Sequence, residues 1–142
     1  LTVRTMHTHL LDTSVYSQRL RPQPLASVVA HWQDRGDHSL AISSLCEAEL
    51  LYGLAKKNSP RLWKEYREYL ENRLVILPMD KSVAHLFGNL KAEMESRGTP
   101  RADFDLLIAA TAIHHGLIFA TLNIRHFVGI PRLVCEDWSK LA

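Results

Sequence analysis

"DFDLLIAATAIHHGLIFAT" (103–121) places a long apolar helical pattern directly before a short apolar run. Residues 103–115 predict a helix, Gly116 follows its end, and residues 117–121 predict a buried strand. A strand that is buried on both faces reads as a continuous apolar run, as this one does. The stretch therefore favours a fold in which helices cover a sheet.

The same alternation extends to the rest of the chain. Further short apolar runs predict strands at 9–12, 40–43, 74–78 and 132–136. Helical patterns lie near 24–35, 45–58, 60–72 and 80–97. Strands that alternate with helices imply βαβ units, and hence an α/β fold with a mostly parallel sheet of about five strands covered on both faces. Ligands of such folds bind at the carboxyl ends of the strands.

Composition limits the class of protein. The 142 residues are 46% hydrophobic and 23% charged, with a net charge of +2, which suits a single globular domain over 1–142. We expect no membrane association, because no apolar run approaches the ~20 residues of a spanning helix. The N-terminus lacks a signal-peptide layout, and Cys46 and Cys135 lack motif spacing. These features predict free thiols and a cytoplasmic protein.

Two aspartates stand where chemistry is expected. Asp12 ends the first apolar run, although a helix cap or turn would also explain it. Asp105 lies in an apolar segment, in the first turn of a helix for which Asp103 is the expected N-cap. A helix dipole contributes only about 0.3–1 kcal/mol, whereas burying an ion costs several kcal/mol. A bound divalent cation would offset that cost.

Two glutamates near the start of the 45–58 helix differ in their expected roles. Ser44 and Glu47 fit a capping box, which assigns Glu47 a structural role facing solvent. Glu49 is expected on the inward stripe, or partly buried beside the helix dipole. The other members of that stripe have helical spacing, namely Leu45, Ala48, Tyr52 and Ala55.

Three acids near strand ends or helix starts can converge on one pocket. Repulsion among Asp12, Glu49 and Asp105 would then be relieved by protonation or by a metal ion. Ligands that are all oxygens favour Mg²⁺ or Mn²⁺ over zinc. Such a cluster suits metal-assisted hydrolysis of a phosphodiester, in which the ion activates water and stabilises the charge on the phosphate.

Four segments in this order resemble the PIN domain, and most closely its VapC-type toxin ribonucleases of bacterial toxin–antitoxin pairs. They are "LLDTSV" (10–15), "AISSLCEAELLYG" (41–53), "DFDLLIAATA" (103–112) and "ATLNIRHF" (120–127). The resemblance extends from about Met6 to Trp138. It implies a Rossmann-like α/β/α sandwich and an endoribonuclease that depends on Mg²⁺ or Mn²⁺. It also implies a homodimer that is inhibited by a VapB-like antitoxin in a heterotetramer or larger assembly.

The resemblance also assigns residues. The family's acidic positions fall on Asp12, Glu49 and Asp105, which would be catalytic and hold the metal. Its fourth position often carries an acid, but here it is His126. The substitution puts a second metal site in doubt. His126 could contact phosphate, or it could be a neutral side chain hydrogen-bonded beside the acids.

Supporting roles are expected for neighbouring polar residues. Asn123 could supply an amide oxygen or a water contact, and Thr121 would shape the pocket. Thr13 or Ser14 could orient a water or a phosphate. A separate group of basic residues near 56–73 would either form a solvated face or steer phosphate.

Two alternatives differ in class. One is a catalytically inactive PIN-type adaptor. The other is a receiver-like magnesium-binding signalling module, for which Asp80 and Lys140 are the available residues. The sequence names neither the RNA nor the antitoxin. The first five residues could be disordered or lie upstream of the true start, because Met6 is a possible start.

Overall fold

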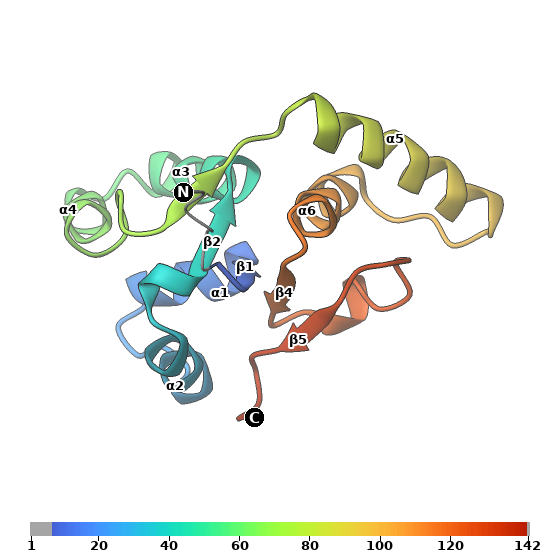
Figure 1. Cartoon of the computed structure of the whole chain (residues 1–142). Helices are drawn as coiled ribbons and strands as arrows, with labels where there is room; N and C mark the ends of the chain where they lie inside the picture. The colour runs from blue at the N-terminus through green and yellow to red at the C-terminus, as the bar shows by residue number, and fades with distance from the viewer. Residues whose placement is uncertain (1–6, 142) are drawn as a thin grey trace, which may run out of the picture.

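A parallel sheet of five strands runs through the centre of the molecule in the order β3-β2-β1-β4-β5 (Figure 1). The computed structural model describes residues 7–141, so the expectation about the first five residues and Met6 lies outside the described residues. All four strand pairings are parallel, and the strands are β1 (His9–Leu11), β2 (Leu40–Ser43), β3 (Val75–Leu77), β4 (Ile118–Thr121) and β5 (Cys135–Asp137).

Helices cover both sides of this sheet, which confirms the α/β/α sandwich. The α-helices are α1 (Thr13–Tyr16), α2 (Ala26–Arg35), α3 (Ser44–Lys57), α4 (Pro60–Tyr69), α5 (Lys81–Ser96) and α6 (Asp103–His114). Short 3-10 turns are η1 (Ser17–Leu20), η2 (Asp37–Ser39) and η3 (Ile124–His126). Figure 1 shows α2 and α4 to one side of β2, and α5 and α6 to the other. Within residues 7–141, no helix is both long enough and apolar enough to cross a membrane.

The strand order creates one switch point. From β1 the chain adds β2 and then β3 on one side, and it returns to add β4 and β5 on the other. β1 therefore pairs with both β2 and β4. Ligand sites of parallel α/β sheets lie at the carboxyl ends of the strands beside such a point. Asp12 follows β1 there, and Thr121 is the last residue of β4.

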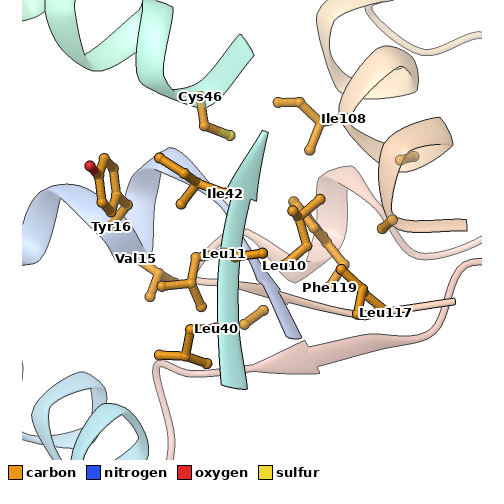
Figure 2. Packing of buried hydrophobic residues seen from close by; sticks show 14 of the residues in the cluster. Leu10, Leu11, Val15, Tyr16, Leu40, Ile42, Cys46, Ile108, Leu117 and Phe119 are labelled. Carbon is orange, nitrogen blue, oxygen red and sulfur yellow. The ribbon is translucent and has the colours of Figure 1, made fainter. Parts of the chain in front are cut away.

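Alternation along the strands builds a core on each face of the sheet. In Figure 2, Leu10 points toward Ile108 of α6, and Leu11 points toward Val15 of α1. All four side chains are at most 1% exposed. Each buried leucine contributes about 1.5–3 kcal/mol relative to its exposure to water. The core thus holds α1 and α6 against opposite faces of β1. Helix α1 directly follows Asp12, and α6 carries Asp105.

The start of α3 differs from the prediction. Ser43, rather than Ser44, caps the helix by accepting a hydrogen bond from the backbone N of Cys46 (3.0 Å). Ser44 Oγ instead accepts from the backbone N of Met79 (3.2 Å). Glu47 closes no capping box, because its carboxylate accepts hydrogen bonds from two tyrosine hydroxyls, Tyr16 (3.3 Å) and Tyr66 (2.9 Å). The predicted capping box is therefore wrong.

The start of α6 is also shifted by one residue. Ala102 is the N-cap, and Asp103 is the first helical residue, so the cap predicted at Asp103 is wrong. Asp103 pairs instead with Lys91 of α5 (2.9 Å). The prediction that Asp105 lies in the first turn is confirmed.

A partly buried polar network joins β1, α2 and β5. Glu136 accepts hydrogen bonds from His9 Nε2 (3.1 Å) and from Trp138 Nε1 (2.8 Å), and Arg35 Nη2 lies 3.5 Å from the same carboxylate oxygen. His31 stacks on Trp138 with ring centroids 4.9 Å apart. The last strand is thus tied to the first strand through side chains as well as through β4.

Candidate active site at the carboxyl ends of β1 and β4

Three donors hold the Asp12 carboxylate. Its Oδ1 accepts a hydrogen bond from the backbone N of Thr13 (2.9 Å), so Asp12 is the N-cap of α1. A helix cap was one of the roles that the sequence predicted for this residue. Its Oδ2 accepts from Ser14 Oγ (2.8 Å) and Thr121 Oγ1 (2.8 Å). A carboxylate can accept about four hydrogen bonds. The three that are made fix the orientation of Asp12 and leave one lone pair on Oδ1.

The two hydroxyls are themselves held by the turn after β4. Ser14 Oγ accepts from the backbone N of Leu122 (3.2 Å), and Thr121 Oγ1 accepts from the backbone N of Asn123 (2.9 Å). Both hydroxyl protons are directed to Asp12. Ser14 and Thr121 therefore position the carboxylate, and their short chain of hydrogen bonds ties α1 to the end of β4.

Asp105 faces the same cavity from α6. Its side chain is 25% exposed, so it is partly rather than fully buried, and its Oδ2 lies 4.0 Å from His126 Nδ1. Burial raises the pKa of Asp105, and the negative charges of Asp12 and Glu49 raise it further, against the opposing effects of His126 and Arg101. The pKa direction shows that the fold disfavours the charged form of Asp105.

Glu49 reaches the cavity from α3, although not as predicted. It is exposed, and so are Ala48, Tyr52 and Ala55 of the predicted inward stripe. The buried face of α3 instead carries Cys46, Leu50 and Leu54. The predicted inward position of Glu49 is wrong, but its side chain still lines the cavity that Asp12 and Asp105 line.

The cavity has a volume of about 270 Å³ and gathers most of the candidate residues. Its polar lining comes from Asp12, Thr13, Ser14, Ser17, Glu49, Asp105, Asn123 and His126, and its apolar lining from Phe104, Ile108 and Phe127. Thr121 is fully buried behind Asp12 and is not part of the lining. The sequence carried no signal for Ser17, because a four-residue helix and a 3-10 turn produce no periodic pattern.

The oxygen atoms that line the cavity suit a hard cation, but they do not form a compact cluster of metal ligands. Across residues 7–141, no three His, Cys, Asp or Glu side chains stand close enough together to hold an ion directly. Thr13 Oγ1 is buried and has no hydrogen-bond partner in this part of the chain. Mg²⁺ usually keeps several waters and binds one or two carboxylates directly. The wide spacing and the unpaired hydroxyl are compatible with ligation that is partly through water.

Comparison with known proteins agrees with the fold. The model of the PIN domain family matches residues 9–132. The ribonuclease VapC2 of Haemophilus influenzae is 33% identical over 130 residues, which cover 92% of this chain and 97% of that protein. The tRNA(fMet)-specific endonuclease VapC of Salmonella typhimurium is 36% identical over 99 residues, or 70% of this chain and 75% of that protein.

A solved structure extends the likeness to three dimensions. VapBC2 from Rickettsia felis, bound to a DNA fragment from the promoter of the pair, contains a chain that superposes with a TM-score of 0.82. The two chains are 30% identical, and the match covers 92% of this chain and 98% of that one. With the family model matched over most of its length and the VapC relatives above, this chain belongs to the PIN-domain family, in its branch of VapC ribonucleases.

Proposed function

We propose that this protein is a metal-dependent endoribonuclease, the toxin of a VapBC-type pair, which cleaves RNA and so inhibits translation and growth. The observation that carries the proposal is the convergence of Asp12, Glu49 and Asp105 on one polar cavity at the switch point of the sheet. The relatives named ribonuclease and endonuclease supply the reaction class.

The residues of the cavity fit Mg²⁺ or Mn²⁺. Asp12, Glu49 and Asp105 would hold the ion, directly or through water, because hard cations prefer carboxylate oxygens. When bound, the ion would activate water and stabilise negative charge on the phosphate. The raised pKa of Asp105 also agrees with this role, since a nearby cation would favour the charged form that the metal-free fold disfavours.

The surrounding side chains would then orient Asp12 and position a phosphate oxygen or an ordered water. Ser14 and Thr121 hold Asp12 in one orientation. Asn123 and His126 line the open side of the cavity, where a phosphate oxygen or an ordered water would lie. Water would attack in line with the leaving oxygen, without a covalent intermediate on the protein.

The partners follow from the neighbours. The chains that superpose include those of VapBC and FitAB complexes, some of which are bound to DNA. We therefore propose that this protein binds a VapB-like antitoxin, and that it does so as a homodimer within a heterotetramer or larger assembly, as the resemblance to VapC-type toxins implies.

Cleavage of RNA by the purified protein tests the proposal. RNA ends would be mapped after incubation with Mg²⁺, with Mn²⁺ and with a chelator. We expect discrete ends in the presence of either metal, and none with the chelator or with Glu49→Gln. A folded protein that binds RNA but yields no ends with either metal would instead be the inactive PIN-type adaptor.

The receiver-like alternative does not fit the site. Asp80 accepts a hydrogen bond from the backbone N of Val83 (2.9 Å) and caps α5. It does not line the acidic cavity. The chain also matches the PIN-domain family, and its VapC relatives are named ribonuclease and endonuclease rather than signalling proteins.

A further inference from the structure

A second cavity adjoins the acidic one. It has a volume of about 480 Å³ and lies between the α1–η1 segment and helices α3 and α4. Three residues, Thr13, Ser17 and Glu49, line both cavities. The two cavities are therefore neighbouring parts of one surface, with Glu49 at their border. We call the second cavity the basic groove, because Arg21, Lys57 and Arg61 line it.

Three cationic side chains from three segments line the basic groove. Arg21 follows η1, Lys57 is the last residue of α3, and Arg61 lies in the first turn of α4. All three are exposed. Among the described residues, neither Arg21 nor Lys57 forms an ion pair, and Arg61 pairs only with Glu65 of its own helix (3.0 Å). An exposed pair of this kind contributes about 0–1 kcal/mol, so Arg61 can change partner at little cost.

The floor of the basic groove is apolar. Leu20, Leu50 and Leu54 are each at most 8% exposed, and the cationic groups stand around them. Among the described residues that line it, Glu49 is the one acid, and it also belongs to the acidic cavity. The groove therefore offers positive charge at its rim and an apolar surface below, separated from the acidic cavity by one carboxylate.

A phosphodiester chain needs such a surface next to the acids. The acidic cavity carries three carboxylates and would repel the phosphates on each side of the one being cleaved. Affinity for a nucleic acid comes mainly from cations that neutralise its phosphates. Proteins that bind single strands place such cations along a groove that follows the backbone.

We propose that the basic groove binds the RNA strand on one side of the cleavage point. Arg21, Lys57 and Arg61 contact the phosphates of the flanking nucleotides, and the leucine floor supports a base or a ribose. This inference rests on the proposed ribonuclease function. The strand leaves the acidic cavity past Glu49 and toward α4.

Binding of oligouridylates tests the inference. The protein carries Asp105→Asn, so that the probes are not cut. A short oligouridylate is compared with longer ones that are extended at either the 5′ or the 3′ end. We expect one extension to increase affinity, and Arg21→Gln or Lys57→Gln to remove most of that increase. Each should weaken binding of the longer probe by about threefold to tenfold and reduce the salt slope by about 0.7.

Lys56→Gln is the matched control. Lys56 precedes Lys57 and is also exposed, but its Nζ lies 6.0 Å from the ring centroid of Tyr52, and it does not line the groove. Its substitution should leave RNA affinity and the salt slope unchanged. Thermal unfolding of each variant checks that the fold is intact, and because all these side chains are exposed, little change is expected.

The outcomes separate this inference from the proposed function. If RNA is cleaved with metal but the groove variants keep wild-type affinity, the inference is overturned and the proposed function stands. If the groove variants lose affinity while the wild-type protein cleaves nothing, the groove is supported and the proposed function fails. If RNA binding is unchanged but binding of poly-L-glutamate is lost, the groove is a site for an acidic peptide, which also overturns the inference.

Discussion

Asp12 and Asp105 line the same cavity, yet their carboxyl groups are held differently. Asp12 accepts three hydrogen bonds, from the backbone N of Thr13 and from the hydroxyls of Ser14 and Thr121. Asp105 receives none in the described part of the chain, and burial and neighbouring acids raise its pKa. The two residues should therefore respond differently to the same substitution.

Asp105→Asn should stabilise the metal-free protein at pH 7. The folded-state pKa of Asp105 lies above the unfolded value, so the carboxyl contributes stability below about pH 4 that is lost as the pH rises through the folded value. The stabilisation should therefore shrink toward pH 4. Thermal unfolding at both pH values measures it, and RNA cleavage should be lost at both.

Asp12→Asn should destabilise the protein by about 1–3 kcal/mol, because an amide cannot accept all three hydrogen bonds that the carboxylate accepts. Unfolding in urea, with Asp105→Asn as the paired variant, measures the difference. An equal gain in stability for both variants would contradict the hydrogen-bond geometry around Asp12.

His126→Asp should lower the concentration of Mg²⁺ or Mn²⁺ that gives half-maximal cleavage. His126 Nδ1 lies 4.0 Å from Asp105 Oδ2, so an acid there would add a charge beside a proposed ligand. His126→Asn is the control, because it removes the imidazole without adding charge. A metal titration at fixed pH gives the result. An unchanged or higher metal requirement for His126→Asp would exclude the residue from the ion's surroundings and favour a phosphate contact.

Among the helices, α3 has a buried face that its sequence alone does not determine. Its sequence offers two apolar stripes, one with Leu45 and Tyr52 and one with Leu50 and Leu54. Spacing alone cannot choose between them, because the choice depends on which face meets the sheet and α4. The structure buries the second stripe. The pairing of Ser43 rather than Ser44 with Cys46 was likewise decided by where β2 ends.

The strands were predictable for a different reason. Three of them, β1, β2 and β4, are buried almost without interruption, and the run at 40–43 matches β2 residue for residue. The acids Asp12 and Asp105 were also predictable, because each stands next to an apolar segment. The role of Thr121 as a donor to Asp12 was not, since 109 residues separate the two and only the sheet brings them together.

Glu47 should act as a clamp between helices. Its carboxylate joins Tyr16 of α1 and Tyr66 of α4, both of which are at most 4% exposed. Burial and the charge of Glu47 raise the pKa of both phenols, so they remain donors. Glu47→Ala would leave two buried hydroxyls unpaired and should cost about 2–6 kcal/mol, at about 1–3 kcal/mol for each group.

Glu47→Gln keeps a side-chain oxygen that accepts hydrogen bonds, so it should cost clearly less than Glu47→Ala. Denaturant unfolding of the two variants measures both costs. Glu65→Ala, at an exposed ion pair of α4, is the control and should change little. Equal costs for the two Glu47 variants would show that the tyrosine contacts are not important for stability.

For the whole molecule, acid should loosen the tie between β1 and β5. Burial lowers the pKa of His9, against the opposing charge of Glu136. Burial alone would raise the pKa of Glu136, but the hydrogen bond from Trp138 and the charges of His9 and Arg35 outweigh it and lower that pKa. Both shifts have the same consequence, which is that stability is lost as the pH falls.

The free energy of unfolding should therefore decrease below about pH 6.5, where His9 in the unfolded chain becomes protonated. It should decrease further below about pH 4.5, where Glu136 in the unfolded chain becomes protonated. Urea unfolding between pH 7 and pH 5 measures the first step. His9→Gln should flatten it, whereas His115→Gln should remove a smaller part, since His115 has a lowered pKa but is exposed. A slope that His9→Gln leaves intact would place the acid sensitivity elsewhere.

The strand order has a consequence for the newly made protein. β1 is synthesised before its partner β4, which ends at Thr121, and the carboxylate of Asp12 has all three of its donors only when that residue is in place. Pairings this distant along the chain form late and slowly. During translation, a growing chain that ends before Thr121 lacks one of the donors to Asp12, and one that ends before Asp105 also lacks the third acid. The nascent chain should thus have no nuclease activity until β4 has emerged and paired with β1.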